Sequence, residues 1–330
     1  MKQKKHKEAN FISAVLYLHK QEKNVIPFLE KICRMLETNF ENFEIICVDD
    51  DAGEQIYRQI VEFQKNRDVT ISVIHMGFCQ GIEAGMNAGV DLSIGDYVFE
   101  FDSGFAEYEE PLMMEAYEKC MAGYDIVSVR MPKTGGRLSS KIFYKVFNRY
   151  SHTQHPLATE LFCIVSRRAV NRVSAYSSVI PYRKAVYAAS GMNLAVIECR
   201  PRQTGNRMRN RNRQSERGRV NTATDAIVLF TDLAYRVSLF FSAMMAVVMF
   251  GFGIYTVAAY FMSEKLVAGW SPLMGLLSLG FLSLFLLMTF MFKYLETIVK
   301  LLFKKQKYSV QTIENMNCYE GKKGGCVNDK

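Results

Sequence analysis

The sequence predicts an α/β domain with a mainly parallel sheet, followed by a two-helix transmembrane hairpin. Strand-like segments alternate with amphipathic helices through the first hundred residues, an order typical of a sheet with helices on both faces. Two apolar runs without a charged residue, Val237–Met262 and Ser271–Phe292, are separated only by Ser263–Trp270. Each run is long enough to cross a hydrocarbon core of about 30 Å as a helix.

The elements of the α/β domain follow from local patterns. Short apolar runs predict strands, and apolar residues at helical spacing predict helices, as in Asn24–Thr38. The expected strands are Phe11–Leu18, Phe43–Val48, Val69–Ile74, Tyr97–Phe101 and Leu194–Glu198. The expected helices are Asn24–Thr38, Gln55–Lys65, Gly81–Leu92, Ser139–Tyr150, Val170–Ser174 and Thr222–Asp232. Ser139–Tyr150 is amphipathic and either covers the sheet or lies on a bilayer surface.

Composition changes divide the chain into four parts. Residues 1–10 form a basic tail, residues 11–220 the α/β domain, and residues 221–310 the membrane anchor. Residues 311–330 are polar and rich in Gly and Lys, and we expect them to be a mobile tail. Eight scattered cysteines show neither a disulfide framework nor a CxxC metal pair, which indicates reduced thiols.

The charge distribution predicts the orientation in the membrane. The net charge is +8, and eight arginines lie between Arg200 and Arg219, just before the first apolar run. Five lysines follow the second run, whereas the connecting loop has one Lys and one Glu. Positive charge favours the cytoplasmic side. We therefore expect a multi-pass protein of the cell membrane (inner or plasma membrane), with the α/β domain and both termini in the cytoplasm.

Several segments resemble inverting family 2 glycosyltransferases of the GT-A class. These are FISAVLYLHKQEKNVIPFLEKI, FEIICVDDDAG and GIEAGMNAGVDLSIGDYVFEFDSG. Later, SSKIFYKVFNRYS and the run from Gly269 to Val310 resemble the juxtamembrane helix, second span and exit segment of polyprenyl-phosphate glycosyltransferases. Dolichyl-phosphate mannose synthases and bactoprenol glucosyltransferases belong to that group.

The resemblance implies a Rossmann-like GT-A fold and a reaction. A UDP- or GDP-linked sugar binds in the cytosolic domain, and the phosphate of a polyprenyl carrier attacks the anomeric carbon with inversion. The product would serve the synthesis or modification of a cell-envelope glycan. The resemblance also implies Mg²⁺ or Mn²⁺ as cofactor and, as partners, the donor, the carrier, the bilayer and a possible homo-oligomer.

Asp49 and Asp50 match the family's pair that contacts the base and ribose of the nucleotide. Carboxylates suit this role because they accept hydrogen bonds from base N–H groups and hydroxyls. The alternative is that these acids only solvate a turn at the end of a strand.

Asp102 matches the first acid of the family's DXD motif and is expected to be catalytic and to bind the metal. The second acid is replaced by Gly104. Glu100 lies two residues before Asp102 and should face the same side of the strand. It either replaces the missing metal ligand in part or pairs with a basic neighbour.

Two further groups are assigned by alignment to the family. Glu160 lies one residue before the position of the family's aspartate, the general base, which is Leu161 here; Glu160 is either the catalytic base after a local shift or a surface charge. Arg202 matches the family's phosphate-binding motif, and Arg207 and Arg209 supply charge where serine and lysine are altered. These three arginines are expected to bind the acceptor phosphate.

The sequence also bears on competing functions. The arginine-rich segment has no aromatic residue, so nucleic-acid binding is not expected. Processive polymer synthases are disfavoured because their QxxRW motif is absent and the only tryptophan is Trp270. The altered positions leave one main alternative, a catalytically degenerate membrane scaffold or binding subunit. A basic membrane-surface adaptor without nucleotide affinity is a third.

Overall fold

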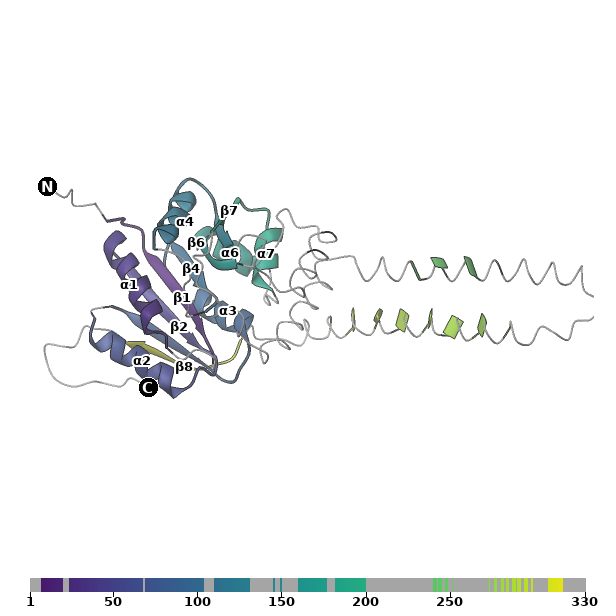
Figure 1. Cartoon of the computed structure of the whole chain (residues 1–330), viewed down its shortest axis with the longest axis horizontal. Helices are drawn as coiled ribbons and strands as arrows, with labels where there is room; N and C mark the ends of the chain where they lie inside the picture. The colour runs from purple at the N-terminus through teal and green to yellow at the C-terminus, as the bar shows by residue number, and fades with distance from the viewer. Residues whose placement is uncertain are drawn as a thin grey trace, which may run out of the picture.

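The computed structural model describes seven continuous ranges of the 330-residue chain. They are residues 7–19, 24–67, 69–103, 110–130, 160–176, 182–199 and 308–316. Outside them it describes single positions, namely 145, 149 and a set between 240 and 298. Figure 1 shows that the continuous ranges form one α/β domain.

The domain is built on an eight-stranded sheet in the order β7-β5-β6-β4-β1-β2-β3-β8. The strands are β1 (Ile12–Leu18), β2 (Phe43–Asp49), β3 (Ile71–Met76), β4 (Tyr97–Phe101), β5 (Ile126–Arg130), β6 (Glu160–Ser166), β7 (Leu194–Glu198) and β8 (Val310–Met316). The centre is parallel, as predicted, with β1 pairing β2 and β4, and β2 pairing β3. However, β6 runs antiparallel to β4 and β5, and β8 antiparallel to β3. Strand β7 pairs parallel with β5, so the sheet is mixed, with four parallel and three antiparallel strand pairs.

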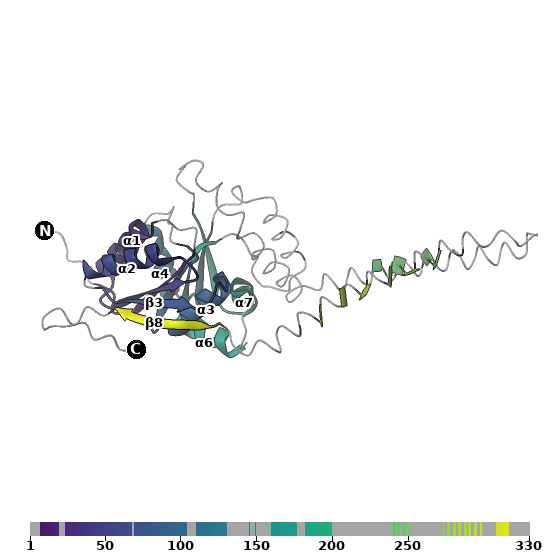
Figure 2. The same ribbon diagram turned by 90° about the horizontal axis from the view of Figure 1, so that it is seen from below.

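Helices cover both faces of the sheet, as the alternating pattern predicted (Figure 2). One core lies under α1 (Ile26–Asn39), α2 (Glu54–Lys65) and α4 (Pro111–Met121). The other lies under α3 (Ile82–Leu92), α6 (Arg167–Tyr176) and α7 (Arg183–Ala189). Residues of β1 alternate between the two cores, which is why its whole length is buried and all of it except Ser13 is apolar.

Two glycines let α3 lie close to the sheet. A Cβ added at Gly85 would lie 2.9 Å from the ring of Tyr17, and one at Gly89 would overlap Val15 and lie 2.9 Å from Val48 Cγ2. They are four residues apart, so both face the sheet. This close packing fixes α3 beside the ends of β1 and β2, where the predicted nucleotide-binding acids lie.

Segments near both ends of the chain form backbone hydrogen bonds with the domain. The expected mobile tail from residue 311 is wrong for residues 311–316, which belong to β8 at the edge of the sheet. Its side chains are mostly exposed, and its three apolar residues, Val310, Ile313 and Met316, are three apart and do not alternate as in a half-buried strand. In the basic tail, Glu8 forms a bridge with Phe40 and exchanges backbone hydrogen bonds with Asn39 and Glu41.

Other predicted segments lie wholly or mostly outside the described residues. Among them are Thr222–Asp232, the arginine-rich segment, and Ser139–Tyr150 except for helical positions Lys145 and Arg149. Within the predicted spans, only scattered positions are described, all of them helical. Among the described residues, no helix has the length and apolar character needed to cross a membrane.

Candidate functional site

The two acidic strand ends predicted to form the site lie at one edge of the sheet. Strand β1 separates β2 from β4, and all three run parallel. Asp49 ends β2, and Asp102 directly follows β4. Two strand spacings put their backbones about 10 Å apart. The prediction that these acids share the carboxyl edge, where open α/β sheets bind ligands, is confirmed.

Asp50 holds the loop that leads into α3. Its side chain is buried, and it accepts hydrogen bonds from the backbone N–H groups of Gln80 (2.8 Å) and Gly81 (2.7 Å) and from the hydroxyl of Tyr17 (2.7 Å). A buried carboxylate needs such partners to offset its lost hydration. Asp50 therefore orders this edge of the site, and its contact with a nucleotide stays a prediction.

Asp49 is joined to the next strand. One carboxylate oxygen accepts from the backbone N–H of Ala52 at 2.8 Å, and the other lies 2.9 Å from His75 Nδ1. The hydrogen bond to Asp49 raises the pKa of His75 above its ordinary value, although partial burial opposes this. Asp49 is partly exposed and lies at the carboxyl edge, where a base or ribose could meet it.

Glu100 pairs with a basic neighbour, which is the second of the two alternatives that the sequence left open. Arg183 Nε donates to one carboxylate oxygen at 2.9 Å, and the hydroxyl of Tyr187 donates to the other at 2.5 Å. Glu100 and Arg183 are only 2% and 1% exposed. Burial disfavours the charge of Arg183, but Glu100 and Glu83 outweigh it and raise the Arg183 pKa well above its ordinary value.

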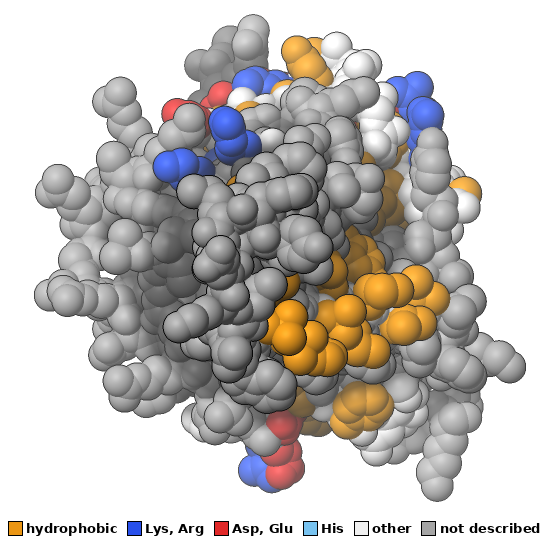
Figure 3. Space-filling view, turned by 90° about the vertical axis from the view of Figure 1, so that its right-hand side faces the viewer, with side chains coloured by type: hydrophobic (Ala, Val, Ile, Leu, Met, Phe, Trp, Pro, Cys, Tyr) orange, Lys and Arg blue, Asp and Glu red, His pale blue; other side chains and the backbone are white. Residues whose placement is uncertain are grey.

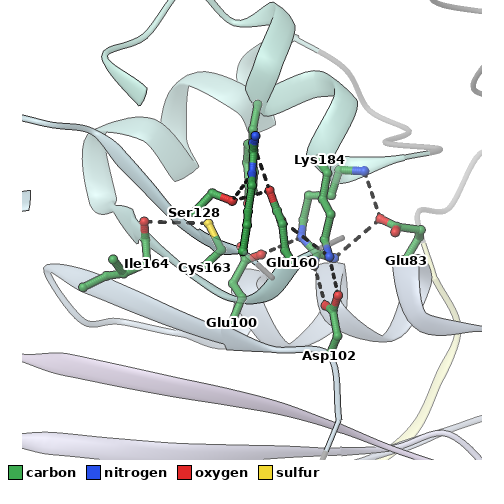
Figure 4. A network of polar contacts seen from close by, with 11 residues as sticks. Glu83, Glu100, Asp102, Ser128, Glu160, Cys163, Ile164 and Lys184 are labelled. Carbon is green, nitrogen blue, oxygen red and sulfur yellow. Dashed lines mark hydrogen bonds and ion pairs between the residues drawn. The ribbon is translucent and has the colours of Figure 1, made fainter. Parts of the chain in front are cut away.

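Lys184 joins the two predicted catalytic acids. Its Nζ contacts Asp102 Oδ2 and lies 3.5 Å from Glu160 Oε2 (Figure 4). Asp102 follows β4 and Glu160 begins β6, the antiparallel neighbour of β4. The side chain of Lys184 is largely buried, so its charge is poorly screened by water. The structure thus brings Asp102 and Glu160 together around one cation.

Glu160 is buried and is not a surface charge. It accepts a 2.5 Å hydrogen bond from the hydroxyl of Ser128 and lies 3.5 Å from Arg130 NH2. Arg130 also donates to Ser128 at 2.9 Å. Both partners come from the neighbouring strand β5 and fix the carboxylate in place. Its carboxylate lies beside the same cation as that of Asp102, so Glu160 belongs to the cluster at this edge, and its role as the catalytic base stays a prediction.

The two predicted metal ligands, Asp102 and Glu100, are both paired with cationic side chains in this structure. A divalent cation needs several oxygen ligands. Over the described ranges, no group of three or more His, Cys, Asp or Glu side chains is placed to hold a metal ion. Asp102 is engaged by Lys184, and Glu100 by Arg183 and Tyr187. Mg²⁺ or Mn²⁺ stays a prediction, and we derive no chemical step from it.

The sequence reasoning missed the basic pair Arg183–Lys184. Two adjacent basic residues near a helix start are usually solvated, and no local pattern marks these as buried. The sequence indicates them only indirectly. A carboxylate in a buried strand, such as Glu100, needs a basic partner from elsewhere in the chain. The three predicted phosphate-binding residues, Arg202, Arg207 and Arg209, lie outside the described residues, as does Gly104.

Comparison with known proteins identifies a family for this chain. The family described as Glycosyl transferase family 2 matches residues 13–179, which contain Asp49, Asp50, Asp102 and Glu160. A curated relative, the uncharacterized glycosyltransferase sll0501 of Synechocystis sp. (strain ATCC 27184 / PCC 6803 / Kazusa), is 27% identical over 186 residues. The match covers 54% of this chain and 58% of the relative, so it spans little more than half of that protein.

Among solved structures, three are similar to this chain at low sequence identity. S. aureus TarS 1-349 in complex with UDP-GlcNAc is 14% identical with a TM-score of 0.42, over 66% of this chain and 67% of that one. M. tuberculosis glucosyl-3-phosphoglycerate synthase is 13% identical with a TM-score of 0.45, over 66% and 78%. The mannosyltransferase PcManGT from Pyrobaculum calidifontis, with GDP-Man and Mn²⁺, is 11% identical with a TM-score of 0.41, over 91% and 89%.

The family match extends over half of the chain and includes the acidic strand ends that the structure places at one edge of a mixed α/β sheet. This chain belongs to glycosyl transferase family 2, and its described domain has the Rossmann-like α/β architecture that the resemblance to GT-A enzymes implies.

Proposed function

We propose that this glycosyltransferase moves a sugar from a UDP- or GDP-linked donor to a polyprenyl phosphate, with inversion, at a membrane surface. The observation that carries the proposal is the meeting of Asp102 and Glu160 around Lys184, two strands from Asp49. In this proposal Asp49 holds the base or ribose of the donor. The Lys184 cluster, made of Lys184, Asp102 and Glu160, lies beside the diphosphate and the sugar. The product would feed the synthesis or modification of a cell-envelope glycan.

The reaction suits this set of side chains. An oxygen of the acceptor phosphate forms a bond to the anomeric carbon while the bond from that carbon to the diphosphate breaks. The electron pair leaves with the nucleoside diphosphate, so no proton has to move. Because the nucleophile is already anionic, orientation by Glu160 matters more than proton removal. Lys184 supplies positive charge near the leaving diphosphate, in a site that Arg130 and Arg183 help to fix.

The membrane anchor belongs to the same proposal. Large apolar side chains are exposed at the described helical positions of both predicted spans. They include Phe240, Met244 and Val247 in the first span and Leu273, Leu277, Phe281, Leu284, Met288 and Met291 in the second. Figure 3 faces this side of the molecule and shows hydrophobic side chains gathered on it. Repeated apolar exposure on a helix is typical of contact with lipid or a partner.

We therefore propose that residues 237–262 and 271–292 span the cell membrane, with the catalytic domain and both termini in the cytoplasm. The excess of Arg and Lys outside the two spans supports this orientation. Arg202, Arg207 and Arg209 precede the first span and would hold the acceptor phosphate near the lipid headgroups. Association of the anchor into homo-oligomers is part of the proposal.

The test uses the purified full chain in liposomes that contain undecaprenyl phosphate, with a panel of UDP- and GDP-sugars and with Mg²⁺ or Mn²⁺. We expect one donor to yield a lipid-linked sugar, and Glu160→Gln to abolish or strongly reduce this product. Glu115→Gln, an exposed acid on α4, serves as the matched control. A folded protein that binds UDP or GDP but transfers no sugar from any donor would instead favour the scaffold alternative.

A further inference from the structure

The C-terminal strand of the domain is joined to the two acids proposed to bind the nucleotide. After the second proposed span, the chain returns to the sheet as β8 and pairs with β3 over six residue pairs. Strand β3 lies beside β2, which carries Asp49 at its end. The return strand therefore lies two strands from Asp49, on the side of the sheet away from the Lys184 cluster (Figure 1).

One connection runs from the start of β8 to Asp50. The Gln80 side chain donates to the backbone oxygen of Ser309 at 2.6 Å and accepts from the Ser309 N–H at 2.9 Å. The same residue donates its own backbone N–H to Asp50 at 2.8 Å. The backbone N–H of Gly77 also donates to the Ser309 oxygen, at 3.0 Å. The loop that surrounds the Asp50 carboxylate is thus fastened to the residue that precedes β8.

A second connection runs from the middle of β8 to Asp49. Glu314 Oε1 lies 3.9 Å from His75 Nε2, and the other nitrogen of this ring lies 2.9 Å from Asp49. The hydroxyl of Tyr57 donates to Glu314 at 2.6 Å and holds it in place. His75 is therefore positioned between one carboxylate on β8 and one on β2. Each proposed nucleotide-binding acid is therefore connected to the return strand or its preceding residue through one intermediate residue, Gln80 for Asp50 and His75 for Asp49.

We infer that β8 is a positioning element of the nucleotide site. Gln80 and His75 are the positioning residues that relay its placement to Asp50 and Asp49. A strand that only covered a sheet edge would need the backbone ladder alone. Here two sets of side-chain contacts lead from the strand to the predicted site. Because β8 follows the proposed second span, the end of the anchor is fastened to the nucleotide site.

This inference rests on the proposed function, since it assumes that Asp49 and Asp50 hold a nucleotide. Gln80→Ala is the sharpest test, because it removes both side-chain bonds to Ser309 and keeps the backbone N–H that Asp50 accepts. Ser72→Ala is the matched control: it removes the 2.9 Å hydrogen bond to Asn315 near the opposite end of the same strand pair. Both variants loosen β8, and only the first does so beside Asp50.

The experiment is titration calorimetry of UDP and of GDP with the full chain, together with the thermal midpoint of each variant. We expect Gln80→Ala to bind the accepted nucleotide about tenfold more weakly than the wild type, which is about 1.4 kcal/mol. We expect Ser72→Ala to stay within about twofold of the wild type while losing similar thermal stability. With a donor sugar, the KM of Gln80→Ala should rise while kcat stays nearly unchanged.

The possible failures are distinguishable. If the wild type binds nucleotide and Gln80→Ala binds it equally well, or if Ser72→Ala is weakened as much as Gln80→Ala, the inference is overturned and the proposed function stands. If the folded wild type binds neither UDP nor GDP, the proposed function is contradicted and this inference falls with it.

Discussion

Replacing Arg183 by Met tests whether the buried ion pair organises the site. Arg183 is 1% exposed, and its Nε donates to Glu100 at 2.9 Å. Its two terminal nitrogens lie 3.7 Å from Glu83 and 3.6 Å from Asp102. The substitution leaves Glu100 buried with only Tyr187 as a hydrogen-bond donor among the contacts described above. Removing one partner of a buried pair costs about 3–5 kcal/mol, because the other charge stays desolvated.

The assay is thermal unfolding of the full chain, followed by circular dichroism. For a domain of this size, the loss corresponds to a midpoint lowered by about 6–20 °C. Arg58→Met is the matched control, because the Arg58–Glu54 pair is 74% and 73% exposed and should contribute less than about 1 kcal/mol. Adding Glu100→Gln to Arg183→Met should recover part of the loss. A midpoint for Arg183→Met as close to wild type as that of Arg58→Met would refute the reasoning.

Three further predictions follow from other contacts. Lys184→Met should lower turnover by roughly 10²–10³-fold, because it removes the cation between Asp102 and Glu160, as steady-state kinetics would measure. Gly89→Ala should destabilise the domain by about 1–3 kcal/mol, because the added methyl would overlap Val15, as chemical denaturation would measure. The pairing of His75 with Asp49 should stabilise the fold most below pH 6.5, because the folded pKa is raised. This contribution should fade as the pH rises through that folded pKa, as thermal midpoints from pH 5.5 to 9 would show.

Each of these three predictions has a control and a contradicting result. Lys119→Met, on the far helix α4, should keep full turnover, and equal turnover in Lys184→Met would contradict the role of that cation. A Gly89→Ala protein as stable as wild type would contradict the close packing of α3 on the sheet. His75→Gln should lose the part of the pH dependence that comes from this pair, and an unchanged profile would contradict the pairing.

The centre of the fold was predictable because its pattern is local. Strands β1, β2 and β4 are short apolar runs between helices, and their predicted bounds differ from the observed ones by at most one residue. β8 was missed because its residues are mostly exposed and its few apolar residues do not alternate, and because its pairing with β3 joins segments far apart in the sequence. The antiparallel placement of β6 likewise depends on long-range pairing that no local pattern encodes.

The acidic residues of the site were predictable from the sequence, whereas its basic residues were not. Asp49, Asp102 and Glu160 were recognised from their places in motifs and strand ends, and the structure brings the last two together. Lys184 and Arg183 belong to a short helix without a distinctive pattern, and their role depends on packing against β4 and β6. Burial of Glu160 by Ser128 and Arg130 could not be read from its neighbours in the sequence, because those partners come from β5.

The most direct test of the central claim follows a radiolabelled sugar in membranes that contain the overexpressed chain. A panel of labelled UDP- and GDP-sugars is supplied, and the lipids are then extracted and treated with mild acid. The account predicts label in a polyprenyl-phosphate-linked sugar that depends on Asp102 and Glu160. Label found only in water-soluble products or in a polymer, or equal labelling with Asp102→Asn, would contradict it.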